Sequence, residues 1–180
     1  MSLPFLFGMN EFTTQPWSFE EDVAHYKEAG VQAIEICEAK LDPARIHEQM
    51  TLAANSGMTI SAIQPSVRTF FDSKMAPEPA DPAQRAARLR KSLATLAPDA
   101  PGTVFGTNTG APPNGNRHRV RDETARYLRD WCPLAADLGV SRSLEPLNPT
   151  SVNVESAIWT IEQALEIIEG VGHPAMGLCL

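Results

Sequence analysis

The stretch VQAIEICEAKLDPARIHEQMTLAANSGMTISAIQ, residues 31–64, contains two short apolar runs separated by an amphipathic segment. The runs 31–37 and 58–64 have the length and the β-branched content of buried strands. Between them, Asp42 followed by Pro43 is typical of a helix start, and Gly57 is typical of a helix end. A strand, a helix and a second strand in this order predict a right-handed crossover between parallel strands.

The same order repeats along the whole chain. Further apolar runs predict strands at 4–10, at 102–108, in the segment that ends at Glu145, and at 176–180. Ser18 and Glu21 have the spacing of a capping box and predict a first helix that ends at Gly30. Later helices are predicted from Asp81-Pro82, before Gly139, and from about Asn153. The last helix is expected to direct Ile158, Ile161, Leu165 and Ile168 inward, and the third to expose Arg85, Arg88, Arg90 and Lys91 on a solvated face.

Alternating strands and helices of this kind predict an α/β protein with a buried parallel sheet. Two architectures compete, an open doubly wound sheet and a (β/α) barrel. The turn after the first predicted strand reads NEFTTQPWS, residues 10–18, which lacks the glycine fingerprint of a dinucleotide-binding sheet. We therefore predict an incomplete (β/α) barrel of the TIM-barrel type, a single domain over residues 1–180 with about six parallel strands and five helices.

The composition narrows the possible partners. The 180 residues carry a formal net charge of −7, and nucleic acid or an anionic membrane requires the opposite sign. Cys37, Cys132 and Cys179 have no zinc-binding spacing, so we expect buried reduced thiols in a cytoplasmic protein. The opening MSLPFLFGMN is interpreted as a strand rather than a signal peptide, and no apolar run is long enough to span a membrane.

Polar side chains gather where the predicted strands end. In a parallel barrel, active sites are built at this face. The alternative is that strand ends are simply solvated and polar, although carboxylates from several strands favour a binding site for a cation or a polyol. The members of this set are Asn10, Glu11, Glu35, Glu38, Gln64, Asn108, Glu145 and Asn148.

Glu145 is the most informative member, because an ionisable carboxylate ends an otherwise buried strand. Alternation along the strand places Ser143 and Ser141 on the same side as Glu145 and directs Arg142 toward the helices. An unpaired buried guanidinium costs several kcal/mol, so Arg142 needs an acidic partner or lies on a strand under relaxed selection. Glu145 itself is either a catalytic or metal-binding carboxylate, or a group that caps the next turn or pairs with a lysine.

Two aromatic segments have both a functional and a packing interpretation. The loop 65–80 contains Arg68, Phe70 and Phe71, which suit a substrate lid with a cation for a phosphate or carboxylate. Ordinary packing over the barrel mouth explains the same residues. Trp17 either forms a wall of a sugar site or fixes the start of the first helix.

Three segments resemble the sugar phosphate isomerase/epimerase family, the xylose isomerase-like TIM barrels. They are residues 7–41, 81–110 and 139–180, and the sharpest element is LEPLNP at 144–149, followed a helix later by GLCL at 177–180. The resemblance implies a divalent metal, Mn²⁺, Mg²⁺ or Co²⁺, held by carboxylates and a histidine at the top of the barrel. Glu145 matches the strand-five glutamate, which in this family is a metal ligand and an acid/base group.

The resemblance also implies a substrate and a reaction. We expect a sugar or related hydroxy-carbonyl compound, isomerised or epimerised by proton transfer next to the carbonyl. The residues expected to bind this substrate are Asn10, Trp17, Glu38, Gln64, Arg68, Asn108 and Asn148.

The family pattern continues beyond Leu180 with an aspartate that is the second metal ligand. A full barrel of eight units has about 250 residues, so we expect a C-terminally truncated member that lacks the last two strand–helix units. The alternative function is an inactive barrel fragment that binds a small polyol or a partner chain. Self-association through unpaired barrel edges is expected in either case.

Overall fold

The computed structural model describes residues 4–111, 113–152 and 154–180. Within them, strands in the order β1-β2-β3-β4-β5-β6 form one sheet in which all neighbours are parallel. The strands are β1 (Gly8–Asn10), β2 (Ala33–Cys37), β3 (Thr59–Gln64), β4 (Val104–Thr107), β5 (Ser141–Leu144) and β6 (Met176–Leu178).

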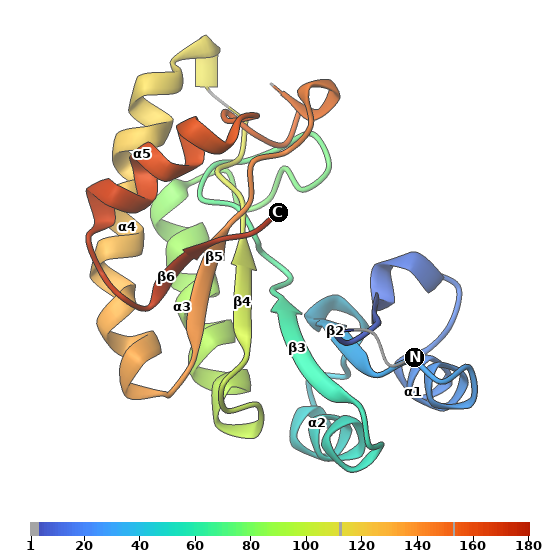
Figure 1. Ribbon diagram of the computed structural model, residues 1–180. Helices are drawn as coiled ribbons and strands as arrows, with labels where there is room; N and C mark the ends of the chain where they lie inside the picture. Colours follow the sequence, from blue (N-terminus) through green and yellow to red (C-terminus); the bar gives the residue numbers. More distant parts are fainter. Residues whose placement is uncertain (1–3, 112, 153) are drawn as a thin grey trace.

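Each of the first five strands is followed by a helix. The helices are α1 (Phe19–Glu28), α2 (Ile46–Asn55), α3 (Pro82–Leu96), α4 (Arg117–Asp137) and α5 (Ile161–Val171). Figure 1 shows α3, α4 and α5 along one side of β4, β5 and β6. The strand order never reverses, as it would in a doubly wound sheet, and no pairing joins β1 to β6 in the described part of the chain. The predicted incomplete barrel is therefore confirmed.

The helix starts follow the predicted capping chemistry in two of three cases. Ser18 and Glu21 form a reciprocal capping box at α1, and Asp81 accepts from the backbone of Ala83 ahead of Pro82 at α3. The start predicted at Asp42-Pro43 is wrong, because α2 begins at Ile46. Asp42 instead closes a turn, in which Arg45 N donates to Asp42 O at 2.8 Å.

The first predicted strand is shorter than residues 4–10. Only Gly8–Asn10 pair with β2, and Phe5, Leu6 and Phe7 have exposed fractions of 51–63%. The backbone carbonyl of Phe7 accepts from the amides of Gln32 and Ala33, which anchors the segment just before β1. Because β1 is an edge of the sheet, its apolar neighbours find no second strand to cover them.

The predicted last helix has a different start and a different buried face. The predicted start at Asn153 lies outside the described residues, and α5 begins at Ile161 after its cap, Thr160. Ile161 and Leu165 were expected to face inward but are 45% and 39% exposed. Ala164, Ile167 and Val171 are buried instead, because they pack into the apolar cluster that α5 forms with α4 and β6.

Two arginines are fully buried between the sheet and the helices. Arg85 was predicted on a solvated face, which is wrong, although Arg88, Arg90 and Lys91 are exposed as expected. Its guanidinium donates to the carbonyls of Thr69, Ala76 and Pro79 at 2.9, 3.1 and 2.9 Å. These three carbonyls belong to the loop between β3 and α3, so Arg85 fixes the shape of that loop.

Arg142 faces the helix layer, as its position on β5 predicts. The guanidinium carbon of Arg142 lies 5.1 Å from the ring centroid of Trp131, and none of the three guanidinium nitrogens has a hydrogen-bond partner among the described residues. Burial lowers the pKa of Arg142 to about 10. Of the two explanations that the sequence offered for Arg142, an acidic partner is not found among the hydrogen bonds of the described residues.

None of the described helices combines the length and the apolar character that crossing a bilayer requires. Cys37 and Cys132 are buried free thiols, as expected, whereas Cys179 is partly exposed. The cytoplasmic location stays a prediction.

Candidate active site

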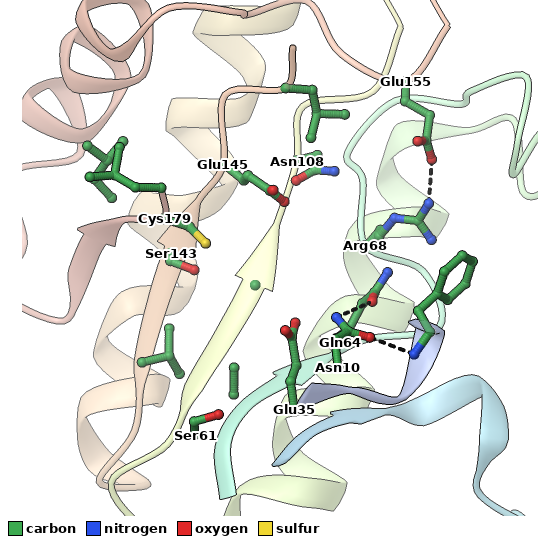
Figure 2. A pocket seen from close by; sticks show the side chains of 17 residues that line it. Asn10, Glu35, Ser61, Gln64, Arg68, Asn108, Ser143, Glu145, Glu155 and Cys179 are labelled. Carbon is green, nitrogen blue, oxygen red and sulfur yellow. Dashed lines mark hydrogen bonds and ion pairs between the residues drawn. The ribbon is translucent and has the colours of Figure 1, made fainter. Parts of the chain in front are cut away.

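A pocket of about 650 Å³ opens at the carboxyl ends of the strands. Small side chains form its floor, among them Ala62, Gly106 and Ser143. Figure 2 shows the polar residues of its walls directed into the same space. They are Asn10, Glu35, Gln64, Arg68, Asn108, Glu145 and Glu155.

Glu145 is held in place by the end of β4. Its backbone N–H donates to Thr107 O at 3.0 Å, which continues the β4–β5 ladder by one residue. The hydrogen bonds around the side-chain amide of Asn108 are satisfied when its nitrogen faces Glu145. The nitrogen then donates to Glu145 Oε2 at 3.2 Å and to Thr107 O at 3.0 Å. Ser143 lines the same pocket, so the predicted alternation along β5 holds at this end.

Glu35 faces Glu145 from the other side of the pocket (Figure 2). It lies in β2 beside an irregularity, where the register with β3 shifts between Ile34 and Glu35. The shift leaves Ser61 as an extra residue on β3, and its hydroxyl donates to Ile34 O at 3.2 Å. As a result the adjacent residues Ser61 and Ala62 both line the pocket, which a regular strand does not allow.

The two facing carboxyl groups influence each other. Burial raises the pKa of Glu145 above its ordinary value, and the charge of Glu35 raises it further. Burial also raises the pKa of Glu35, although a hydrogen bond from Asn10 opposes this effect. Carboxyl groups with raised pKa values are suited to accept and return a proton near neutral pH.

Asn10 and Gln64 form the wall beside Glu35. Asn10 Nδ2 lies 3.5 Å from Gln64 Oε1, and Asn10 Oδ1 accepts from the backbone of Phe12 at 2.6 Å. The wall therefore joins the ends of β1 and β3 and presents amide groups, which can both donate to and accept from a hydroxyl group.

Arg68 and Glu155 form an ion pair at the mouth of the pocket. Arg68 lies in the loop after β3 and Glu155 in the segment after β5, and the Nη2–Oε1 distance is 2.5 Å. Their side chains are only 21% and 15% exposed. The neighbouring Phe70 and Phe71 are buried in the helix layer, so this loop combines a packing role with one side chain at the pocket.

Three residues predicted to bind substrate lie outside this pocket. Glu38 accepts from Ser66 N and Ser92 Oγ, both at 2.7 Å, and so joins the end of β2 to α3 and its preceding loop. Asn148 is exposed and accepts from Thr150 N at 3.0 Å, which caps the turn after β5. The side chains of Glu38 and Asn148 therefore stabilise local structure, which agrees with the alternative that strand ends are polar without binding a ligand.

Trp17 is the third residue outside the pocket. Its ring lies 4.6 Å from that of His25 on α1 and lines a separate apolar cavity of about 230 Å³ with Phe7, Met9 and Tyr26. This arrangement matches the interpretation in which Trp17 fixes the first helix.

Glu11 lies at the same strand end as Asn10 but is fully buried beneath the site. Its Oε2 accepts from Cys37 N at 2.7 Å, while its Oε1 has no partner among the described residues. Burial is the main reason that the pKa of Glu11 is raised to about 8. The negative charge of the nearby Asp22, which is paired with Lys40, also raises this pKa.

This raised pKa predicts a loss of stability with rising pH. The folded state keeps the Glu11 proton up to about pH 8, whereas the unfolded chain loses it near pH 4.5, so the free energy of unfolding falls across that interval. We expect Glu11→Gln to remove about 3 kcal/mol of this fall between pH 5 and pH 8. Urea denaturation of both proteins at the two pH values measures it, and parallel pH profiles would contradict it.

Three further pocket residues were not among those expected to bind substrate, although Glu35 was one of the polar residues noted at the strand ends. Glu35 was visible as a charge inside the apolar run AIEIC, but the register shift that places it opposite Glu145 was not. Glu155 and Cys179 also line the pocket. Neither carries a local signal, because both reach the site through the path of the chain after β5 and β6.

The side chains of the described residues do not complete the metal site that the family resemblance implies. The described residues contain no group of three or more histidine, cysteine, aspartate or glutamate side chains that could hold a metal ion. His25, His47 and His118 have exposed side chains on α1, α2 and α4. The described residues thus offer Glu145 without the further ligands of a complete site.

The position of the pocket, the open parallel barrel and Glu145 at the end of β5 together agree with a sequence comparison. A family model described as a xylose isomerase-like TIM barrel matches residues 23–180. The chain belongs to this family.

Solved structures of the xylose isomerase-like fold superimpose on nearly the whole chain. Protein SMc04130 from Sinorhizobium meliloti 1021 has a TM-score of 0.78 at 22% identity and covers 96% of this chain. The IOLI protein with a bound zinc atom has a TM-score of 0.73 at 16% identity and covers 97%. D-Psicose 3-epimerase, solved in the presence of D-fructose, has a TM-score of 0.72 at 15% identity and covers 97%.

The alignment spans 62% of the length of each of these three structures. The TM-scores show a shared fold, and at these low sequence identities no residue roles are carried over to this chain. A search of curated proteins finds no match.

Proposed function

We propose that this protein is a sugar isomerase- or epimerase-like protein that binds a sugar or a related hydroxy-carbonyl compound in the pocket of Figure 2. The observation that carries the proposal is the pair Glu35 and Glu145, which face one pocket from opposite walls at the carboxyl ends of the strands. Membership of the xylose isomerase-like family and a 3-epimerase among the similar structures support the reaction class.

Glu145 is the proposed base. Its carboxylate accepts the proton from the carbon next to the substrate carbonyl, and the electron pair of the broken C–H bond forms an enediolate. In an isomerisation, the proton on Glu145, which exchanges with solvent, is delivered to the neighbouring carbon while the proton of the adjacent hydroxyl group moves to the former carbonyl oxygen. In an epimerisation, Glu145 keeps the proton that it took and a protonated Glu35 on the opposite wall adds a different proton to the other face of the carbon. Asn108, Asn10 and Gln64 are proposed to orient hydroxyl groups by hydrogen bonding.

Proton exchange with solvent tests this proposal directly. The protein is incubated in D₂O with ketoses and aldoses, with and without added Mn²⁺, Mg²⁺, Co²⁺ or Zn²⁺, and deuterium next to the carbonyl is followed by NMR. We expect incorporation into at least one sugar above the protein-free rate. Binding without exchange, under every metal condition, would contradict the catalytic part of the proposal.

A second candidate function is non-catalytic binding of a polyol or a partner chain. It is favoured by the incomplete set of metal-ligating side chains in the described residues. In this case the pocket binds the same class of ligand, and the exchange assay distinguishes the two candidates.

Self-association is proposed for either function. β1 and β6 are unpaired edges of a parallel sheet in the described residues, and the apolar segment Phe5–Phe7 is exposed beside β1. We expect size-exclusion chromatography with light scattering to give a mass of at least two chains at micromolar concentration. A stable monomer over the same concentration range would contradict the expectation.

A further inference from the structure

The charges of the pocket walls are unequal. Glu35, Glu145 and Glu155 contribute three carboxyl groups, whereas Arg68 is the one basic side chain among the described lining residues. With all four groups ionised, the lining carries a net charge of −2. A ligand that brings further negative charge is repelled, and this repulsion is stronger in a partly buried pocket than in water.

The guanidinium of Arg68 is also not free to bind a negatively charged ligand, because it is already paired with Glu155. Its guanidinium donates to Glu155 at 2.5 Å, and the side chains of the pair are 21% and 15% exposed. The ring of Phe12 lies 6.0 Å from the guanidinium carbon on another side. A phosphate group that approached Arg68 would have to displace a carboxylate that is already bound and largely shielded from solvent.

The remaining polar groups suit hydroxyl groups. Each hydroxyl group both donates and accepts a hydrogen bond, and the walls offer carboxylate acceptors at Glu35 and Glu145 together with amides at Asn10, Gln64 and Asn108. A phosphate dianion only accepts hydrogen bonds, so it cannot use the carboxylates. The small floor residues Ser61 and Ala62, brought together by the register shift in β3, leave room for a polyol chain beside Glu35.

We infer that this pocket selects an uncharged polyhydroxy compound over its phosphorylated counterpart. Glu155 determines this specificity, because its carboxylate pairs with the guanidinium of Arg68 and keeps it from binding a phosphate group. The inference rests on the proposed function and names its substrate class.

The test compares one sugar with its phosphate. Binding of D-fructose and of D-fructose 6-phosphate is measured by ligand-observed NMR at low ionic strength, where charge effects are least screened. The wild type is expected to bind fructose at least about tenfold more tightly than the phosphate. Glu155→Gln frees Arg68, so binding of the phosphate is expected to become about tenfold tighter while binding of fructose changes little.

Two further variants control this result. Glu166→Gln removes an exposed carboxylate that pairs with Arg121, outside the pocket, and is expected to change neither affinity. The double variant Arg68→Gln/Glu155→Gln is expected to lose the gain in phosphate binding, since no guanidinium remains. Circular dichroism confirms that each variant is folded before binding is compared.

The outcomes separate this inference from the proposed function. Equal or tighter binding of the phosphate by the wild type would overturn the inference and leave the proposed function standing. An unchanged phosphate affinity in folded Glu155→Gln would overturn the role of Glu155. Failure to bind either ligand would overturn the proposed function for this sugar and the inference with it.

Discussion

Glu145→Gln is expected to reduce the rate of deuterium incorporation into a sugar substrate by at least about 100-fold, because a positioned general base contributes about 10²–10⁴ to such a step. Glutamine keeps the size of the side chain and its contact with Asn108, but it cannot accept the substrate proton. Binding of the sugar itself is expected to change less than tenfold, since the amide still accepts a hydrogen bond from a hydroxyl group.

Glu166→Gln provides the matched control for this experiment. It makes the same chemical change at an exposed site between α4 and α5, where the carboxylate pairs with Arg121. The exchange rate of this variant should equal that of the wild type. If Glu145→Gln also exchanged protons at the wild-type rate, the base would be another group, and Glu35 on the opposite wall would be the first to test in the same way.

Arg142→Met is expected to raise the free energy of unfolding by about 3 kcal/mol, because the native guanidinium is fully buried without a hydrogen-bond partner among the described residues. Methionine is shorter but fills a similar volume, and it packs against Trp131 without a charge to desolvate. For a domain of this size, such a change raises the melting temperature by about 6–12 °C. Urea and thermal denaturation measure both quantities.

The same substitution at Arg85 is expected to act in the opposite direction. Arg85 is equally buried, but its guanidinium donates to three backbone carbonyls and to Thr69 Oγ1. Arg85→Met leaves these acceptors without a donor and should lower the free energy of unfolding by about 3 kcal/mol. Two destabilised variants would show that Arg142 has a partner in solution that offsets the cost of its burial.

Local signals in the sequence predicted the architecture well. The capping box at Ser18, the Asp81-Pro82 start and the glycines after α1, α2 and α4 marked a repeating strand–helix unit, and short-range rules are sufficient for such marks. They failed at Asp42, whose turn resembles a cap, and at the last helix, where the register was set by the distant contacts of Ala164 and Ile167.

The candidate site could be predicted only in part. Asn10, Gln64, Arg68, Asn108 and Glu145 were all selected from their positions at or after strand ends, and the structure places all five at one pocket. Glu38 and Asn148 were selected by the same rule, and Trp17 as an aromatic wall of a sugar site, but all three lie elsewhere. The position of a residue in the sequence indicates the end of a strand but not the direction of a side chain once a turn has begun.

The sequence by itself determined the parallel order of the sheet, the face at which the polar residues gather and the position of Glu145 at the end of a strand, because hydrophobic periodicity and strand ends are local properties. Only the tertiary structure decided that Glu35 faces Glu145 and that Glu155 pairs with Arg68. It also decided that the guanidinium of Arg85 has hydrogen-bond partners and that of Arg142 has none among the described residues. These relations join residues up to 110 positions apart. They depend on the register between strands and on the paths of loops, which are fixed by packing across the whole barrel rather than by any short segment.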